Sequence, residues 1–233
     1  MLQVSDLHAG YGDSEVLHSV SLTVNDGEAV VVLGPNGHGK TTLLRAISGL
    51  LQPTAGTVEL DGKVISNAKA EDIVAAGVIH IPQGDLPFPE MTVLENLLMG
   101  AYRSEAWTER HDKLKRVYDL FPVLGERESQ LARSLSGGER RMLAVGRGLM
   151  SRAKILMIDE PSMGLAPIII ENLYDTIREI NKSGLAILLV DENADHVGGL
   201  ADRVYLLESG VLVREGTAAE MLQDEALLST YLG

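Results

Sequence analysis

The chain has 233 residues, of which 45% are hydrophobic, and its 20 Lys and Arg against 33 Asp and Glu give a formal net charge of −13 at pH 7. This composition is typical of a globular protein with one large domain or two small ones. The absence of cysteine excludes disulfide scaffolds, cysteine-based zinc sites and cysteine nucleophiles, and the acidic charge disfavours broad nucleic-acid binding, so we expect no nucleic-acid partner.

The first part of the chain predicts an antiparallel sheet with one buried face. Hydrophobic residues alternate with polar ones through residues 2–24 and again through 56–65, for example at Val20, Leu22 and Val24. Alternation of this kind indicates strands that face the core on one side only. The pair Asp61-Gly62 between two such runs predicts a tight hairpin turn.

Four short and nearly continuous apolar runs, at residues 28–33, 78–81, 155–158 and 186–190, predict a second, parallel sheet. Strands buried on both faces give such runs, and they need helices on both sides. Helical patterns follow at residues 40–50, 167–182 and 194–201. The alternation predicts an α/β fold with a mostly parallel core sheet and helices on both faces.

A helical insertion is predicted between residues 87 and 133, where the strand pattern disappears and apolar residues such as Val93, Leu97 and Val117 recur at helical spacing. Proline and glycine mark its entry, and residues 134–138 mark its exit. We expect one domain in which residues 1–86 and 151–233 form a catalytic core and residues 87–150 form a helical subdomain.

A phosphate-binding loop is predicted directly after the first buried strand, where the sequence matches G-x-x-x-x-G-K-[ST] and continues into a helix. Bare glycine backbone can wrap phosphates with its N–H groups, and the helix N-terminus adds its dipole. We expect Lys40 to reach the β- and γ-phosphates and the Thr41 hydroxyl to bind Mg²⁺. The candidate nucleotide-binding residues of this loop are Gly34, Pro35, Asn36, Gly37, His38, Gly39, Lys40, Thr41 and Thr42.

Two carboxylates end the apolar run at residues 155–158, at the edge where open α/β sheets place their ligands. Asp159 suits the Mg²⁺ shell, and Glu160 suits a base or a group that orients water. Because neighbouring strand residues point to opposite faces, we expect the two to have different roles. A pair of solvated acids that simply closes a strand is the alternative.

The segment Leu135-Ser136-Gly137-Gly138-Glu139 predicts a capping box that opens a helix. Together with the phosphate loop and the Asp-Glu pair, this LSGGE segment resembles the signature of the ATP-binding subunits of ABC transporters, and the resemblance extends over essentially the whole chain. It implies an ATPase with ATP and Mg²⁺ as cofactors. It also implies that Ser136, Gly137, Gly138 and Glu139 bind the γ-phosphate held by the other subunit of a dimer.

Two further residues acquire roles through the resemblance. Tyr11, between two glycines, matches the aromatic residue that stacks on adenine. Gln83 matches the glutamine that reaches Mg²⁺ and the attacking water. The resemblance thus implies Thr41, Gln83 and Asp159 as metal-binding residues, and Glu160 and Gln83 as catalytic residues.

Two positions depart from the family pattern. Glu192, within Asp191-Glu192-Asn193, stands at the catalytic switch position where most members have histidine. An ionised carboxylate cannot donate to a γ-phosphate and repels it. Either Glu192 is protonated, or it points away, or the site is slow. Ala166 replaces the usual aspartate of the loop that contacts the partner subunit.

Several segments resemble the LivF-type subunits of branched-chain amino acid importers, namely residues 91–97, 99–102, 160–167 and 191–193 and the terminal Tyr-Leu-Gly. The resemblance implies a second ATPase as the heterodimer partner, two membrane permease chains and, indirectly, a periplasmic binding protein. The isolated chain is expected to be a monomer or a homodimer. Lacking a spanning segment and a signal peptide, the chain is expected on the cytoplasmic face of the plasma membrane.

Three other functions stay open at this stage. The same type of subunit serves importers of urea and short-chain amides. An ABC-type ATPase can also work in DNA repair or translation, although such proteins usually have coiled-coil insertions or duplicated cassettes. The third alternative is a regulatory module that binds nucleotide without hydrolysing it.

Overall fold

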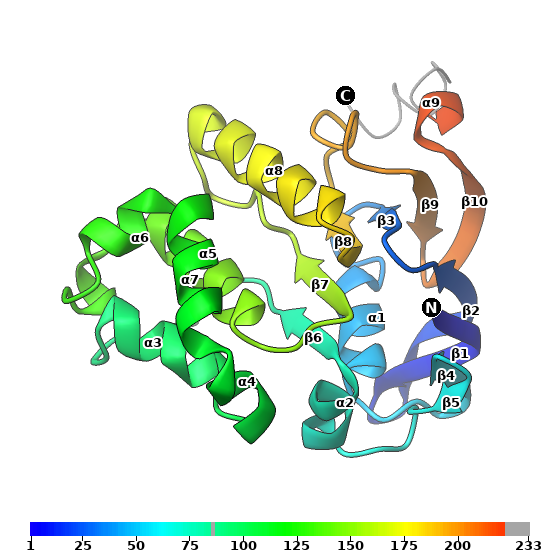
Figure 1. The fold of residues 1–233 in the computed structure, drawn as a ribbon. Helices are drawn as coiled ribbons and strands as arrows, with labels where there is room; N and C mark the ends of the chain where they lie inside the picture. The colour runs from blue at the N-terminus through cyan, green and yellow to red at the C-terminus, as the bar shows by residue number, and fades with distance from the viewer. Residues whose placement is uncertain (85–86, 222–233) are drawn as a thin grey trace.

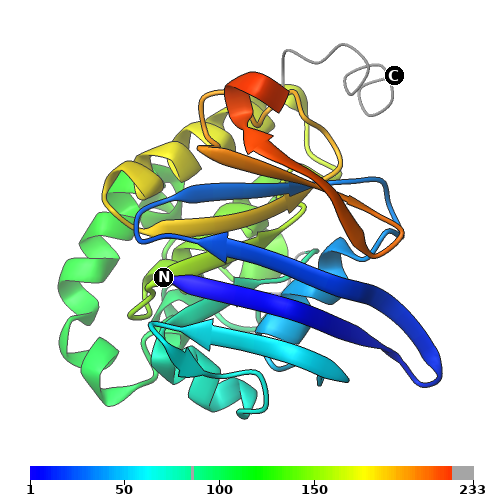
Figure 2. The ribbon, with the colours of Figure 1, turned by 90° about the vertical axis from the view of Figure 1, so that its right-hand side faces the viewer.

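The computed structural model describes residues 1–84 and 87–221, which form two β-sheets and a separate group of helices (Figure 1). The terminal Tyr-Leu-Gly, one of the segments that carry the family resemblance, lies outside the described residues. In the view turned by 90°, the blue and cyan strands of the antiparallel sheet lie below the orange strands of the other sheet (Figure 2). The predicted α/β class, with an antiparallel N-terminal sheet and a core sheet rich in parallel strands, is confirmed.

The antiparallel sheet has the strand order β2-β1-β4-β5. Its strands are β1 (Leu2–Tyr11), β2 (Ser14–Val24), β4 (Ala55–Leu60) and β5 (Lys63–Val64). Asp61 and Gly62 both have positive φ, 53° and 73°, as the predicted hairpin turn requires. Alternate residues of β1 are buried, so one face of this sheet belongs to the core.

The core sheet has the strand order β10-β9-β3-β8-β7-β6. Its strands are β3 (Ala29–Leu33), β6 (Val78–Ile81), β7 (Ile155–Asp159), β8 (Ala186–Asp191), β9 (Arg203–Glu208) and β10 (Val211–Thr217). All neighbouring pairs are parallel except β9 with β10. Every residue of β3, β7 and β8 is buried, as their apolar runs predict.

The two faces of the core sheet belong to two different hydrophobic cores. Val30 and Val32 of β3 pack with α1 (Lys40–Ile47) and with the buried face of the antiparallel sheet. Val31, between them, faces the opposite core, which α8 (Pro167–Lys182) shares with the helical group. Helix α1, which directly follows the phosphate loop, is therefore fixed between both sheets.

The helical group lies on one side of the core sheet, away from the antiparallel sheet (Figure 1). Its helices are α3 (Val93–Gly100), α4 (Ser104–Thr108), α5 (Arg110–Leu120), α6 (Pro122–Glu126) and α7 (Gly137–Leu149), with a short 3-10 turn, η1 (Ala132–Ser134), before α7. Val93, Leu97 and Val117, expected at helical spacing, are buried there. Thr92 and Glu95 form a capping box that starts α3.

The prediction of a helix at residues 194–201 is wrong. This segment is a series of turns, in which the N–H of Val197 donates to Ala194 O and the N–H of Leu200 donates to Val197 O. Gly199 has φ 77°, which breaks a helix, so hydrophobic spacing alone is misleading here.

Other elements differ from the expectation in extent or were not expected. Helix α1 ends at Ile47 instead of residue 50, and Gly49, just after the C-cap residue Ser48, has φ 71°. The pattern also gave no indication of α2 (Ala70–Ala76), α9 (Ala218–Met221), β9 or β10. Within the described residues, none of the helices combines the length and the apolar character that crossing a membrane demands.

A partly buried histidine is expected to make stability depend on pH. Burial, together with the charge of Arg45, lowers the pKa of His80 on β6 to about 4, and its Nδ1 lies 3.1 Å from Ser48 Oγ. In the unfolded chain this histidine has its ordinary pKa near 6.5. Between pH 6.5 and 4 the unfolded chain therefore binds more protons at this histidine than the folded protein does. The stability that neutral His80 contributes should fall across this range by up to about 3 kcal/mol.

The test is urea unfolding of the wild type and of His80→Asn at pH 7, 6, 5 and 4.5. Carboxylates titrate equally in both proteins, so the difference between their free energies of unfolding isolates His80. We expect this difference to shift in favour of His80→Asn as the pH falls. A difference that stays constant over the range contradicts the prediction.

Candidate nucleotide-binding site

Four loops meet at one edge of the core sheet and carry most of the predicted site. They follow β3, β6, β7 and β8, whose carboxyl ends point the same way because these strands are parallel. Side chains that are far apart in sequence thereby come into contact, such as Asn36 with Glu192 and Gln83 with Glu160.

The phosphate loop lies where its backbone has little spare room. A Cβ on Gly34 would stand 2.2 Å from the carbonyl oxygen of Leu207 on β9. Gly39, the N-cap of α1, has φ 106° and faces the Leu17 side chain of β2, so a side chain is disfavoured there by conformation and by space. The glycines of the motif therefore fit a loop pressed between β9 and β2.

The ammonium group of Lys40 has all three of its N–H donors occupied. The side chain is 3% exposed. It donates to Gly34 O at 2.7 Å and to Pro35 O at 3.1 Å, and it pairs with Glu160 Oε1 at 3.1 Å. A phosphate that binds Lys40 must replace one of these partners. Since Glu160 is the only anion among the three, phosphate binding and the position of Glu160 are linked.

Glu160 does not continue the strand that precedes it. Strand β7 ends at Asp159, and Glu160 has φ 43°, an uncommon conformation for a residue with a side chain. Its Oε2 accepts a hydrogen bond of 2.6 Å from Gln83 Nε2, and Gln83 also donates to Met163 Sδ. The expectation from strand alternation, that Asp159 and Glu160 point to opposite faces, is wrong because the left-handed residue turns Glu160 toward the phosphate loop.

Asp159 and Thr41 offer hard oxygen ligands that fit a magnesium ion. Asp159 is fully buried, and its Oδ1 accepts from Thr41 Oγ1 at 3.1 Å. Its Oδ2 lacks a hydrogen-bond partner within residues 1–84 and 87–221, and burial raises the pKa of this carboxyl. A cation would remove that penalty. The described residues hold no group of three or more His, Cys, Asp or Glu suited to a metal, so phosphate oxygens and water must complete any shell.

Glu192 points toward the phosphate loop. Its Oε2 accepts a hydrogen bond of 2.6 Å from Asn36 Nδ2. Of the alternatives left open by the sequence, the orientation away from the loop is therefore not the one observed. The side chain is exposed, unlike that of Glu160.

Tyr11 lies at the end of β1 with 45% of its surface exposed. Arg45 of α1 donates to its hydroxyl at 3.2 Å, which ties the aromatic ring to the helix that follows the phosphate loop. An exposed ring beside this helix can stack on a base, and the role in binding adenine stays a prediction.

The LSGGE segment starts helix α7, and the predicted capping box is confirmed. The N–H of Glu139 donates to Ser136 Oγ at 3.3 Å, and the N–H of Ser136 donates to Glu139 Oε2 at 2.8 Å. A Cβ on Gly138 would lie 2.7 Å from Ile169 of α8. Glu139 also pairs with Arg127 at 3.3 Å. None of these contacts joins the LSGGE segment to the phosphate loop of the same chain. The binding of a phosphate by this segment therefore remains a prediction, and it requires a second subunit.

Sequence reasoning did not foresee the contacts that hold His38. Its Nδ1 accepts a 3.1 Å hydrogen bond from the N–H of Ser209, and its carbonyl oxygen accepts one of 3.0 Å from Gly210. Gly210 O in turn accepts from the N–H of His18 on β2. The turn between β9 and β10 thus links the phosphate loop to the antiparallel sheet. The Ser-Gly pair at residues 209 and 210 was the available turn signal.

Comparisons with known proteins find relatives over the whole length of this chain. A family model described as "ABC transporter" matches residues 17–163. The chain is 39% identical over the full length of both proteins to the high-affinity branched-chain amino acid transport ATP-binding protein BraG of Pseudomonas aeruginosa. It is 36% identical to a probable branched-chain amino acid transport ATP-binding protein, LivF, of Archaeoglobus fulgidus, covering 100% of this chain and 99% of the relative.

Two further comparisons widen the range. The lipopolysaccharide export system ATP-binding protein LptB of Escherichia coli is 34% identical, with coverage of 100% of this chain and 97% of the relative. Among solved structures, a nucleotide-free ATP-binding cassette from an ABC transporter superimposes with a TM-score of 0.86 at 27% identity, covering 100% of this chain and 99% of the other.

The fit of Gly34 against β9 can be tested by adding a single methyl group. Gly34→Ala should reduce the free energy of unfolding by about 3 kcal/mol because the new Cβ meets backbone that cannot move aside. Gly12→Ala is the matched control, since Gly12 has φ +57° but nothing within 4 Å, and it should cost about 1 kcal/mol. Urea unfolding measures both, and equal losses contradict the tight fit.

Proposed function

The chain belongs to the ABC transporter family of ATP-hydrolysing proteins, and we propose that it is the ATPase subunit of an importer for branched-chain or related polar amino acids. The single observation that supports the role of its own site best is the contact of Lys40 with Glu160, which Gln83 completes. The Glu160 carboxylate, which could polarise water, lies within hydrogen-bond reach of a cation able to bind phosphate and of an amide.

In this proposal the backbone N–H groups of residues 34–42 and Lys40 bind the phosphates, and Tyr11 stacks on the base. Thr41 and Asp159 would hold Mg²⁺, which would neutralise charge on the phosphate oxygens, and the amide of Gln83 would be available to the metal and to the water. Glu160 polarises the water once phosphate has taken its place at Lys40. The rate then depends on positioning and charge stabilisation, with no covalent intermediate.

A dimer is needed to complete the site. Ser136, Gly137, Gly138 and Glu139 bind the γ-phosphate held by the other subunit, as the exposed start of a capped helix allows. We propose a different ATPase as the partner in the cell, and a monomer or homodimer for the isolated chain.

We further propose that residues 87–150 act as a helical subdomain that transmits closure to two permease chains, with residues 1–86 and 151–233 as the core. A hollow of about 770 Å³ lies between α2, α4 and α5. Its lining includes five basic residues against two acidic ones: Arg103, Lys113, Arg116, Arg152, Lys154, Glu105 and Glu109. Arg103, Lys113, Arg152 and Lys154 already pair with carboxylates of this chain, so the lining is polar and largely neutralised. In this proposal the hollow receives a polar segment of a permease at the cytoplasmic face of the membrane.

The proposed ATPase activity is tested in the membrane complex, purified through a tag on this chain. Lys40→Ala should weaken ATP binding by about 10- to 100-fold because a buried charged hydrogen-bond donor is lost, whereas Lys63→Ala, on the exposed β4–β5 hairpin, should not.

Glu160→Gln should keep ATP binding and lose the turnover of this chain's own site. Undiminished hydrolysis in Glu160→Gln contradicts the role assigned to Glu160.

Glu192 is expected to slow the site because its carboxylate faces the loop that binds phosphate. Glu192→His should raise the ATPase rate of the assembled complex by about 10-fold, and Glu192→Gln, which also removes the charge, should raise it too. Steady-state phosphate release measures the effect. A lower rate in both variants contradicts the prediction, and Asp195→Asn in the same loop serves as the control.

The transported solute is tested by uptake. Cells that lack this chain should lose binding-protein-dependent uptake of radiolabelled leucine, and the wild-type gene should restore it while Glu160→Gln does not. Urea and acetamide uptake in the same cells tests the related importers. A defect in the outer-membrane lipopolysaccharide with normal leucine uptake favours the role named for the LptB relative instead.

A further inference from the structure

A buried carboxylate lies beside the proposed catalytic residues without belonging to them. Asp191, the last residue of β8, is 2% exposed. Ser162 Oγ donates to both of its oxygens at 3.0 and 3.2 Å, and the Tyr174 hydroxyl donates to Oδ2. The N–H groups of Glu192 and Asn193 donate to Oδ1 at 2.7 and 3.2 Å.

All four of these donors are neutral hydroxyl or amide groups. Burying a carboxylate is costly unless hydrogen bonds replace the lost water, and bonds to an ionised acceptor are shorter and stronger than neutral ones. The Asp191 charge therefore holds its donors firmly in place. Conversely, its own position depends on their staying where they are.

The donors come from segments that carry the proposed catalytic groups. Ser162 lies two residues after Glu160, in the loop that follows β7. Glu192 and Asn193 begin the loop that follows β8. The N–H of Glu160 also donates to Val190 O, next to Asp191. One carboxylate thus joins the loop of Glu160 to the loop of Glu192.

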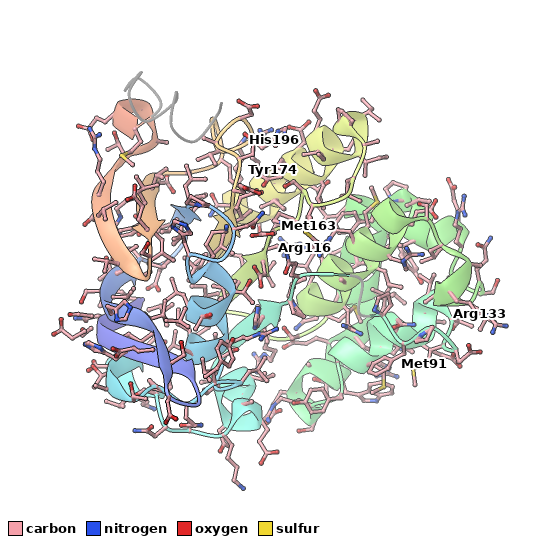
Figure 3. The ribbon with its side chains drawn as sticks, turned by 180° about the vertical axis from the view of Figure 1, so that it is seen from behind. Met91, Arg116, Arg133, Met163, Tyr174 and His196 are labelled. Carbon is pink, nitrogen blue, oxygen red and sulfur yellow. The ribbon has the colours of Figure 1, made fainter. Side chains whose placement is uncertain are left out.

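Tyr174 provides the fixed end of this network. It is fully buried in the middle of α8, and burial beside the Asp191 charge raises the pKa of its hydroxyl, which stays protonated as a donor. The His196 ring lies 5.1 Å from the Tyr174 ring, and both side chains lie between α8 and the segment that follows β8 (Figure 3). Since α8 is packed against the core sheet, it gives both loops a common reference point.

We propose that Asp191 is a positioning residue for ATP hydrolysis, which fixes the loop that carries Glu160 through Ser162, Tyr174 and the amides of the loop that follows β8. The proposal rests on the proposed function, because it assigns Glu160 to the attacking water. It predicts that breaking the network lowers the catalytic rate while leaving nucleotide binding at the phosphate loop intact.

The experiment uses the membrane complex purified through a tag on this chain. The ATPase activity of this chain's own site is taken as the activity of the wild-type complex minus the activity that remains in the Glu160→Gln complex. Asp191→Asn should lower kcat of that part by about 100-fold because a shift of the order of 1 Å in a catalytic group has this effect. KM for ATP and binding of a fluorescent ATP analogue should stay within about threefold. Asp195→Asn, the same change at an exposed position of the same loop, should leave kcat unchanged.

Two smaller variants keep the test valid if Asp191→Asn does not fold. Ser162→Ala removes one hydroxyl donor and should lower kcat by about 10-fold, whereas Ser162→Thr keeps the hydroxyl and should restore it. If Ser162 acts through Asp191, the double variant Ser162→Ala with Asp191→Asn loses no more than Asp191→Asn alone. Thermal melting of each variant shows whether stability has changed in parallel.

Three results overturn the proposal: unchanged kcat in Asp191→Asn and Ser162→Ala, losses that multiply in the double variant, or losses explained by a smaller folded fraction. Failure of the proposed function is a different observation. In that case the wild-type complex itself neither binds ATP through Lys40 nor hydrolyses it.

Discussion

The ammonium group of Lys40 is shared between two backbone carbonyls and one carboxylate, and the rest of the site depends on this arrangement. The carbonyls belong to the phosphate loop itself, so they fix the direction of the side chain. The carboxylate belongs to Glu160, which Gln83 holds from the other side. Because an ammonium has only three hydrogens, an incoming phosphate changes the surroundings of Glu160 as soon as it binds. In the proposed function, one cation therefore couples phosphate binding to hydrolysis.

The shape of the phosphate loop is imposed by both sheets. β9 supplies the carbonyl of Leu207 against Gly34, and the β9–β10 turn supplies the amides that bind His38. The antiparallel sheet contributes through β2 and by packing on α1. The N-terminal strands thus restrict the conformation of the phosphate loop from outside the site.

Much of the fold could be predicted because the governing patterns are local. The runs at β3, β6, β7 and β8 are largely apolar since both faces of these strands are buried, and the helix predicted at residues 167–182 coincides with α8. The helix expected at residues 194–201 failed because Gly199 permits a turn where spacing suggested a helix. β10 was missed because it is an exposed edge strand, whose residues have no need to alternate.

The sequence by itself determined which chemical groups the site has, because the phosphate-loop motif, the Asp-Glu pair and the capping box are each short continuous segments. Each segment carries its own local geometry. Only the tertiary structure decided how these groups meet. The left-handed turn at Glu160, the bond between Asn36 and Glu192 and the network around Asp191 each join segments whose approach depends on strand order and packing. Such long-range contacts leave no periodic trace in the chain, since each partner satisfies its own local rules without the other.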